Sequence, residues 1–398
     1  MRNTLLAVIV VGWGLVLSGA EPRMPTFKKV QLSDKFYAEG AYYADFNKDG
    51  KLDVLAGPFW FEGPDFQKKH EIFPPKDFDP NDYSNNFLTY TGDFNGDGWP
   101  DVLYVPFPGG EAYWYENPGP HEGPWKKHLA LKDVGNESPV WVDINGDGRP
   151  ELIFNTTGYL GYATYDPAKP DEPWVFHAVT PKGNYQRFTH GIGVGDINGD
   201  GRLDIVEAEG WWEQPVQGQA DKPWVKHPFK FAEAASQMYV YDVDGDGLND
   251  VITTWHCHEY GLLWYKQIRD AKGEITWKQN VILPPNPDLK SNDLRISQMH
   301  AVDLVDMNGD GLKDILTGKR FWAHGQHGDA EPDAPAVVYW FELKRDKDHG
   351  VRFIPHQIDD DSGVGTQVTG VDLNGDGIPD VIVSNKKGIF LHLSQPSK

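Results

Sequence analysis

Cysteine is nearly absent from this sequence of 398 residues. The single cysteine, Cys257, excludes an intramolecular disulfide, so packing or metal ions must stabilise the fold in an oxidising compartment. Basic residues are also scarce: 37 Lys and Arg stand against 59 Asp and Glu, and the formal net charge is −22. A chain so acidic is not expected to bind nucleic acid electrostatically.

Long apolar runs are scarce too, and the one clear run lies at the N-terminus. Residues 5–17 are almost wholly apolar, Arg2 precedes them, and small residues follow at 18–20. This pattern predicts a secretory signal peptide over residues 1–20 and a single mature domain over 21–398. The run is shorter than the roughly 20 apolar residues that a membrane anchor needs. We therefore expect a secreted or periplasmic protein with no membrane span after cleavage.

Glycine, proline and aromatic residues are abundant. The 43 Gly and 30 Pro favour many short strands over long helices. With 39% hydrophobic and 13% aromatic residues, the chain can fill one large core. The composition predicts an all-β domain.

A nine-residue motif recurs seven times along the chain. Its first copy, at residues 45–53, has acidic or amide side chains at positions 1, 3, 5 and 9 and glycine at position 6. The first residues of the other copies are Asp93, Asp143, Asp196, Asp242, Asp306 and Asp372. Because the copies begin 46 to 66 residues apart, each suits one four-stranded blade, and the sequence predicts a seven-bladed β-propeller.

Each motif offers an oxygen cage for a hard cation, calcium or magnesium, with glycine allowing the sharp turn between ligands. The motif resembles an EF-hand loop without its twelfth-position Glu, and strands replace the flanking helices. Outside the motifs, acidic residues equal the 37 Lys and Arg in number, so the negative charge belongs to the cation sites. The predicted ligands are Asp45, Asn47, Asp49, Asp53, Asp93, Asn95, Asp97, Asp101, Asp143, Asn145, Asp147, Glu151, Asp196, Asn198, Asp200, Asp204, Asp242, Asp244, Asp246, Asp250, Asp306, Asn308, Asp310, Asp314, Asp372, Asn374, Asp376 and Asp380.

The last blade lacks its outer strand. Residues 388–393 are one strand short of the repeat, and residues 27–32 match the missing strand. We expect the N-terminal strand to complete the last blade and to cover its sheet edge. Recurring histidines mark the outer strands and are expected to be structural: His70, His128, His177, His227 and His356.

Other polar residues are expected at the opposite face from the motif loops, the mouth where propellers usually bind ligands. His190, His300 and Glu137 each lie six residues before a copy of the motif, so they occupy equivalent places in three different repeats. Insertions at 284–296 and 321–335 add further groups around the mouth. These are Arg295, His324 and His327, with Trp60, Trp211, Trp212 and Trp322 expected to stack on a sugar ring.

The segment His256-Cys257-His258 is ambiguous. If it continues a strand, both imidazoles share one face and suit zinc, but a lone His-X-His also arises by chance. With His190 and His300 it suggests a cluster that holds a divalent metal such as zinc or that transfers protons.

The motif resembles the FG-GAP or VCBS repeats of secreted bacterial propellers and of integrin α-chains. Three regions are more particular: residues 189–213, residues 255–262, and residues 317–324 with 338–341. They resemble the propeller of aldos-2-ulose dehydratases, which eliminate water from keto sugars. The resemblance implies a secreted lyase of carbohydrate metabolism. Those enzymes carry further domains, including a cupin linked to a later isomerisation, whereas this chain ends after one propeller, so the resemblance does not extend to isomerase activity.

Elimination from a keto sugar needs a base, a group that holds the enolate oxygen, and an acid for the leaving group. We expect Lys319 and Arg320 to stabilise the oxyanion, and Glu137 or His324 to protonate the leaving oxygen. The metal ligands or proton-transfer groups are then His190, His256, His258 and His300. A non-catalytic module that binds carbohydrate or protein is the alternative, and a zinc-dependent hydrolase is a third possibility.

Overall fold

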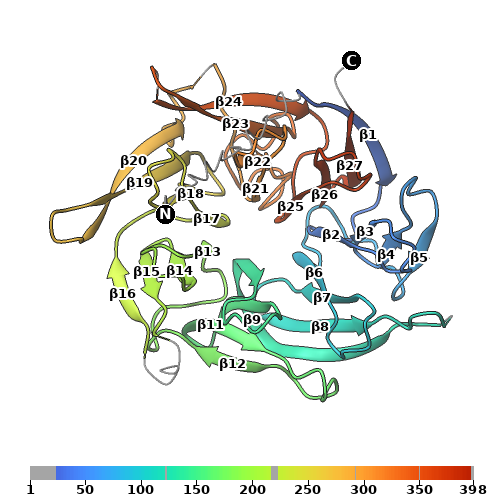
Figure 1. The fold of residues 1–398 in the computed structure, drawn as a ribbon. Coiled ribbons are helices and arrows are strands. Elements are labelled where there is room, and N and C mark those ends of the chain that lie inside the picture. The colour runs from blue at the N-terminus through green and yellow to red at the C-terminus, as the bar shows by residue number, and fades with distance from the viewer. Residues whose placement is uncertain (1–23, 122, 217–222, 292, 349, 396–398) are drawn as a thin grey trace, which may run out of the picture.

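The computed structural model describes residues 24–395 except 122, 217–222, 292 and 349. The predicted signal peptide, residues 1–20, therefore lies outside the described residues. Within those residues every regular element is a β-strand, and the sheets form a ring around a common centre (Figure 1). No helix in this part of the chain has the length and apolar character to cross a membrane.

Hydrogen bonds join the strands into five sheets. One sheet pairs the two ends of the described chain, in the order β1 (Thr26–Ser33), β27 (Gly388–Gln395), β26 (Asp380–Asn385), β25 (Val368–Val371). Two more contain four strands each: β2 (Ala41–Ala44), β3 (Asp53–Ala56), β4 (Phe59–Phe61), β5 (Lys69–Glu71), and β21 (Val302–Val305), β22 (Asp314–Gly318), β23 (Val338–Asp346), β24 (Gly350–Asp359).

The other two sheets are larger. Seven strands form one: β6 (Leu88–Gly92), β7 (Asp101–Val105), β8 (Gly110–Glu116), β9 (Lys126–Val142), β10 (Glu151–Thr156), β11 (Tyr159–Thr164), β12 (Val175–Ala178). Eight strands form the other: β13 (Ile192–Gly195), β14 (Asp204–Glu207), β15 (Gly210–Glu213), β16 (Val225–Pro228), β17 (Met238–Tyr241), β18 (Asp250–Thr254), β19 (Leu262–Arg269), β20 (Ile275–Leu283).

These five sheets differ from the seven separate units that the repeat predicts. The difference has two local causes. β9 is 17 residues long and runs from the rim to the centre, so it joins the strands before and after it. In the larger sheet, β13 pairs in parallel with β17 through Gly193 and Met238, because Gly193 has no side chain to keep the two backbones apart.

The motif explains where the second strand of each repeat begins. Strands β3, β7, β10, β14, β18, β22 and β26 all start at the ninth motif residue. The Asp101 carboxylate accepts hydrogen bonds from the backbone N–H groups of Phe94 and Asn117, each at 2.8 Å. This buried acid ties the motif loop to the end of strand β8. Equivalent acids make the same pair of contacts in most repeats.

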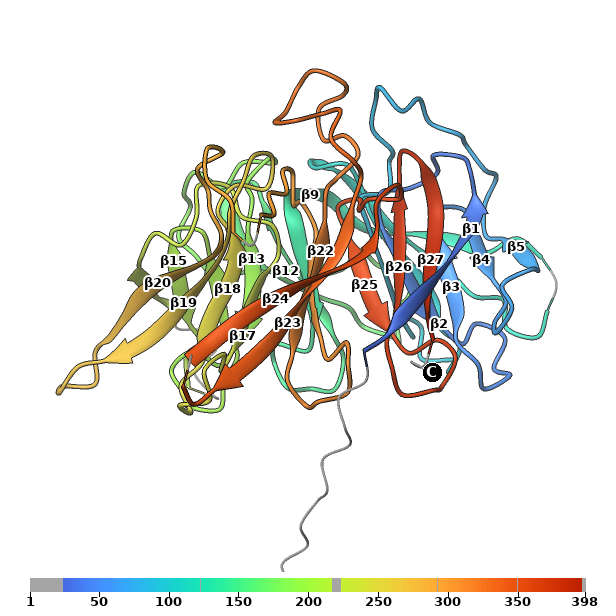
Figure 2. The ribbon, with the colours of Figure 1, turned by 90° about the horizontal axis from the view of Figure 1, so that it is seen from above.

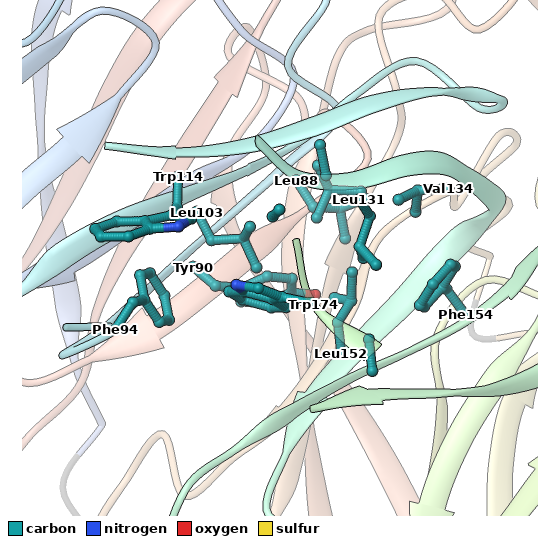
Figure 3. Close-up of a cluster of buried hydrophobic side chains, with 14 of the residues drawn as sticks. Leu88, Tyr90, Phe94, Leu103, Trp114, Leu131, Val134, Leu152, Phe154 and Trp174 are labelled. Carbon is teal, nitrogen blue, oxygen red and sulfur yellow. The ribbon is translucent and has the colours of Figure 1, made fainter. Parts of the chain in front are cut away.

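Large apolar side chains fill the space between neighbouring sheet regions. In the cluster of Figure 3, Phe94 contacts Trp114 and Trp174 with ring centroids 5.6 and 5.3 Å apart. Burial of such rings contributes about 25 cal/mol per Å² of apolar surface removed from water. Glutamines bridge the inner strands: the Gln367 amide accepts from Thr89 N and donates to Thr89 O, both at 3.0 Å.

The two ends of the strands carry different loops. Figure 2 shows the β25–β26 loop, which contains a motif copy, at one end. The long β5–β6 and β22–β23 loops rise from the opposite end. β1 lies antiparallel along β27, with Thr26 opposite Gln395 and Val30 opposite Leu391. The described chain is thus an all-β, propeller-like ring with a motif face and a mouth face.

Candidate functional site

Four polar side chains from different parts of the ring converge at the mouth. Glu137 lies within β9, His190 precedes β13, His300 precedes β21, and His258 follows β18. The His300 Nε2 atom lies 3.1 Å from Glu137 Oε2, and His190 Nε2 lies 3.6 Å from Glu137 Oε1. His190 Nε2 also lies 3.0 Å from His258 Nε2. One buried carboxylate is thus shared between two imidazoles, and a third imidazole contacts one of them.

The hydrogen bonds fix how protons are distributed in this cluster. His190 Nδ1 lies 2.8 Å from the Phe188 carbonyl oxygen and therefore donates to it. Burial alone would lower the pKa of His190, but Cys257 and Glu137 raise it to about 11. Burial would raise the pKa of Glu137, yet His190 and His300 hold it well below its usual value. Burial lowers the pKa of His258, so neutral His258 accepts from His190.

Cys257 is the group in this cluster that the sequence did not single out. Its thiol is fully buried, and its Sγ lies within 4.8 Å of a ring nitrogen from each of His190, His258 and His300. Burial would raise the pKa of the thiol, but the three imidazoles hold it well below its usual range. Three imidazoles and one thiolate form a donor set suited to zinc.

The expected strand geometry of His256 and His258 is wrong. β18 ends at Thr254 and β19 begins at Leu262, and between them the chain turns, with Glu259 N donating to His256 O at 3.0 Å. Alternate residues therefore do not share a strand face here. The His256 ring is not among the groups that converge, and its Nδ1 accepts from the His258 backbone N–H at 3.3 Å.

The β22–β23 loop covers the cluster from the mouth side. Asp329, which the sequence did not predict, accepts from the His324 backbone N–H at 2.7 Å and lies 2.8 Å from His324 Nδ1. Its Oδ1 is also 3.6 Å from His258 Nδ1. The side-chain amide of Gln298 donates to the Ala330 carbonyl at 2.8 Å and holds the loop in place. His324 is exposed and packs 4.6 Å from the His258 ring.

Lys319 and Arg320 have different environments, although both are buried. Arg320 pairs with Glu39 and lies over the Phe87 ring at 5.5 Å. Lys319 Nζ has no hydrogen-bond partner among the described residues, and burial lowers its pKa to about 8, although acids of the β22–β23 loop oppose this. Of these two cations, Lys319 is therefore the one without a paired carboxylate in the described chain.

The tryptophans expected to line the mouth pack inside the ring instead. Trp60 stacks on His70 at 3.8 Å and Trp211 on His227 at 4.0 Å. Trp212 is buried and donates from Nε1 to Glu207 at 2.9 Å. These residues lie in strands whose side chains fill the space between sheets, so their apolar rings are needed for packing.

The remaining predicted mouth residues lie on the long loops. Trp322 is 9% exposed and donates from Nε1 to Pro332 O at 3.2 Å. Arg295 pairs with Glu331 and donates to Pro287 O at 2.7 Å. His327 is exposed. Trp322 and Arg295 hold the loops in place, and none of the three residues is among the groups that converge in the histidine cluster.

The motif loops fold around their own acidic side chains. In the first copy, the Asp45 carboxylate accepts from the backbone N–H groups of Asp49 and Gly50, and the Asn47 side chain accepts from Asp49 N. Most of the later copies repeat this pattern. The fifth copy brings the carboxylates of Asp242, Asp244 and Asp246 within 4.8 Å of one another, and the Lys266 ammonium pairs with the last two.

Burial raises the pKa of the ninth-position acids. Desolvation raises the pKa of Asp101 to about 8, helped by the neighbouring Asp93 and Asp97 and opposed by the two backbone N–H groups. The pKa rises to about 7 for Asp204, Asp250 and Asp314 for the same reasons. These groups lie beneath the loops, where a nearby cation would favour the charged form.

Comparison with known proteins identifies the repeat. Residues 93–154 and 242–317 match the FG-GAP-like repeat, and residues 364–388 match the FG-GAP repeat. A T-cell immunomodulatory protein homolog of Plasmodium falciparum (isolate 3D7) is 26% identical over 207 residues, which cover 41% of this chain. The chain spans 28% of the length of that relative.

Among solved structures, a crystal structure of BBS1N in complex with ARL6DN, soaked with lead, is 11% identical. The alignment covers 95% of this chain and 98% of that chain, with a TM-score of 0.49. Together, the matched repeats and the ring of strands show that this chain contains an FG-GAP, propeller-like domain.

Proposed function

We propose that this protein is a carbon–oxygen lyase that eliminates water or an alcohol from a keto sugar or keto-glycoside at the mouth of the ring. The observation that carries the proposal is the cluster in which His190 and His300 share the buried Glu137 and His258 contacts His190. The buried Lys319 ammonium also has no hydrogen-bond partner in the described chain. Buried titratable groups with strongly shifted pKa values are typical of catalytic sites.

The residues can be assigned to the steps of an elimination. The Glu137–His300 pair removes the proton on the carbon beside the carbonyl, because a carboxylate held at 3.1 Å from an imidazole can pass that proton on. Lys319 holds the enolate oxygen, since Arg320 is already paired with Glu39. His324, exposed and oriented by Asp329, protonates the departing oxygen.

The same cluster fits a divalent transition metal such as zinc. His190, Cys257, His258 and His300 supply nitrogen and sulfur donors, and in the described chain His258 Nδ1 and His300 Nδ1 have no hydrogen-bond partner. These residues would hold the ion, and its binding would release the His190 proton. When bound, the metal would polarise the sugar carbonyl.

The repeat supports a more detailed architecture. If β9 serves as the outer strand of one blade and the inner strand of the next, the strands divide into seven four-stranded blades. The pairing of β1 with β27 would then close the ring. Calcium or magnesium would occupy the seven motif loops, whose acidic and amide oxygens suit hard cations.

The sequence supports a proposed localisation and a class of partner. A cleaved peptide at residues 1–20 would deliver the protein to the periplasm or outside the cell. The substrate would be a small sugar or glycoside, and the net charge of −22 disfavours nucleic acid as a partner. Similarity of the three sequence regions to aldos-2-ulose dehydratases supports keto-sugar chemistry.

The competing function is non-catalytic binding of carbohydrate or protein on the same face. An aromatic-lined cavity of about 520 Å³ on this face supports it. Fold alone does not separate the two functions, because propellers perform both. The histidine cluster favours chemistry, since carbohydrate binding relies more on aromatic and amide groups than on imidazoles.

The test is turnover of defined keto sugars by the wild-type protein. We expect 2-keto or 3-keto sugars and their glycosides to give a conjugated enone, followed by ultraviolet absorbance and by NMR of the product. Incubation in deuterated water should also label the carbon beside the carbonyl. A protein that forms no enone and exchanges no proton with any of these substrates, with zinc and calcium supplied, would contradict the lyase assignment.

A further inference from the structure

A separate groove is lined by the β5–β6 loop, by strands β7 and β8, and by the loop between them. Its volume is about 520 Å³, within the roughly 300–1,000 Å³ typical of ligand sites. Phe73, Tyr104 and Tyr115 form one wall, with Phe73 stacked on Tyr115 at 4.8 Å and Tyr104 edge-on to Tyr115 at 5.5 Å. Aromatic walls of this kind suit the apolar faces of sugar rings.

Three cationic side chains line the same groove. Lys127 Nζ lies 3.4 Å from the centroid of Tyr113, Lys76 Nζ lies 4.5 Å from that of Phe78, and Arg187 also reaches the groove. None of the three cations forms an ion pair with a carboxylate of the described chain. By contrast the neighbouring Lys126, which does not line the groove, pairs with Asp171 at 2.9 Å.

The charge of the groove is opposite to that of the whole chain. In a protein with net charge −22, unpaired cations beside an aromatic wall are a selective site for a negatively charged ligand. Glu111 also lines the groove, but its carboxylate accepts from the Tyr113 hydroxyl. Burial lowers the pKa of Lys127, and a carboxylate ligand would offset that cost.

We propose that this groove binds the acidic part of a glycan, a uronate-containing oligosaccharide, through its aromatic wall and the cations Lys76, Lys127 and Arg187. This proposal specifies the class of sugar on which the proposed lyase acts, and it rests on that proposed function. The groove is linked to the histidine cluster by the chain itself. Arg187 lies three residues before His190, and Glu137 N donates to Thr189 O at 3.0 Å.

Packed rings connect the groove lining to Arg320, the neighbour of Lys319 in the chain. Phe107 lines the groove and contacts Phe188 at 5.7 Å, and it packs edge-on to Phe87, which lies under Arg320. Under this proposal, a chain of several sugar rings lies in the groove with its terminal ring directed towards the cluster. In this arrangement the groove selects acidic chains, and the cluster acts on the end of the chain.

The experiment is calorimetric titration of trigalacturonate and of a neutral trisaccharide into the His300→Ala protein, in which the proposed turnover is blocked. We expect trigalacturonate to bind and the neutral trisaccharide to bind at least tenfold more weakly, because charged hydrogen bonds contribute about 1.5–3 kcal/mol each. Lys127→Gln and Arg187→Gln should each weaken trigalacturonate roughly tenfold by the same reasoning. Lys126→Gln, whose lysine pairs with Asp171 outside the groove, should change affinity by less than about twofold.

Three results would overturn the proposal: no binding of trigalacturonate, equal binding of both trisaccharides, or equally tight binding of inorganic phosphate. Two separate cations are substituted so that the test still gives a result if one of the two variants fails to fold. Failure here is distinguishable from failure of the lyase assignment. A lyase without this groove function would still convert a neutral keto-glycoside, and Lys126→Gln, a change outside the groove, would leave that conversion unchanged.

Discussion

The rim and the mouth of the ring both carry histidines, but their surroundings differ. At the rim, His128 stacks on Trp114 at 3.9 Å and lies 2.8 Å from its own partner, Glu116. The same Trp, His and Glu arrangement recurs at His70, His227 and His356. At the mouth, Glu137 serves both His190 and His300.

The difference separates structural from chemical use of one residue type. Each of these rim histidines has a ring partner on one side and a carboxylate at its Nε2, so its interactions are largely satisfied within the repeat. At the mouth, His258 Nδ1, His300 Nδ1 and Lys319 Nζ are buried and have no hydrogen-bond partner among the residues described. Buried polar groups normally find partners, so the two unsatisfied imidazole nitrogens within one cluster support a ligand site there.

The largest expected effect comes from removing the strand that supports the rim. Deleting residues 21–33 takes away β1, which pairs with β27 and whose Lys29 pairs with Asp359 at 2.8 Å. The exposed edge of β27 should then cause aggregation or loss of cooperative thermal unfolding. Removal of residues 1–20 alone is the control and should leave unfolding unchanged. A soluble 34–398 protein with an unaltered melting curve would show that β1 is dispensable.

The same Glu→Gln substitution should lower turnover at the mouth and leave turnover unchanged at the rim. Glu137→Gln should lower turnover of a keto-glycoside by about 10²–10⁴-fold, because the shared base is lost. Glu116→Gln, the matched change at the rim, should leave turnover unchanged and alter stability by no more than about 1 kcal/mol. Steady-state kinetics and thermal melts of both proteins measure this. Equal turnover in the two variants would remove the distinction between rim and mouth.

Chelation should affect stability around the whole ring. Seven acidic loops without cations place like charges close together, so a chelator should lower the melting temperature at low salt. Excess calcium should restore it, since a loop held at about 100 times its Kd in free calcium adds about 2.7 kcal/mol. Differential scanning calorimetry measures the shift. An unchanged melting temperature would show that the loops are turns that need no cation.

The smallest effect is expected within the rim itself. His177 departs from the pattern of its equivalents, because it is exposed, contacts Tyr162 at 5.1 Å and bonds to Thr164 at 2.9 Å without a glutamate partner. His177→Ala should therefore change the free energy of unfolding by about 0.5 kcal/mol or less. Urea denaturation checks this value. A cost equal to that of His128→Ala would show that ring stacking alone, without the glutamate, supports the rim.

The sequence predicted features that depend on repetition. The FG-GAP motif located the start of the second strand in every repeat. Counting six residues back from the motif identified His190, His300 and Glu137 as equivalent positions. These predictions work because a residue at one register of a repeat occupies the same place in the next repeat. Repetition carries no information about the contacts between repeats or the shape of inserted loops.

The features that the sequence missed depend on those other contacts. Trp60 and Trp211 looked like mouth residues, but their outer-strand neighbours bury them between sheets. Cys257 lies in the cluster because the chain turns after Thr254 instead of continuing as a strand. Asp329 contacts His324 because of the way the β22–β23 insertion folds, and this insertion has no counterpart in the other repeats. Each case follows from tertiary packing that one sequence alone does not reveal.

The most direct test compares one histidine from each region, with turnover and unfolding measured on the same preparations. His300→Ala should lower keto-glycoside turnover by about 10²–10⁴-fold or more while the protein remains folded, because an acid–base group or metal ligand is lost. His128→Ala should keep full turnover and lose about 1–3 kcal/mol of stability, because a buried stacked and hydrogen-bonded ring is removed. If both variants lose stability alike and neither changes turnover, the mouth histidines are structural and the account is wrong.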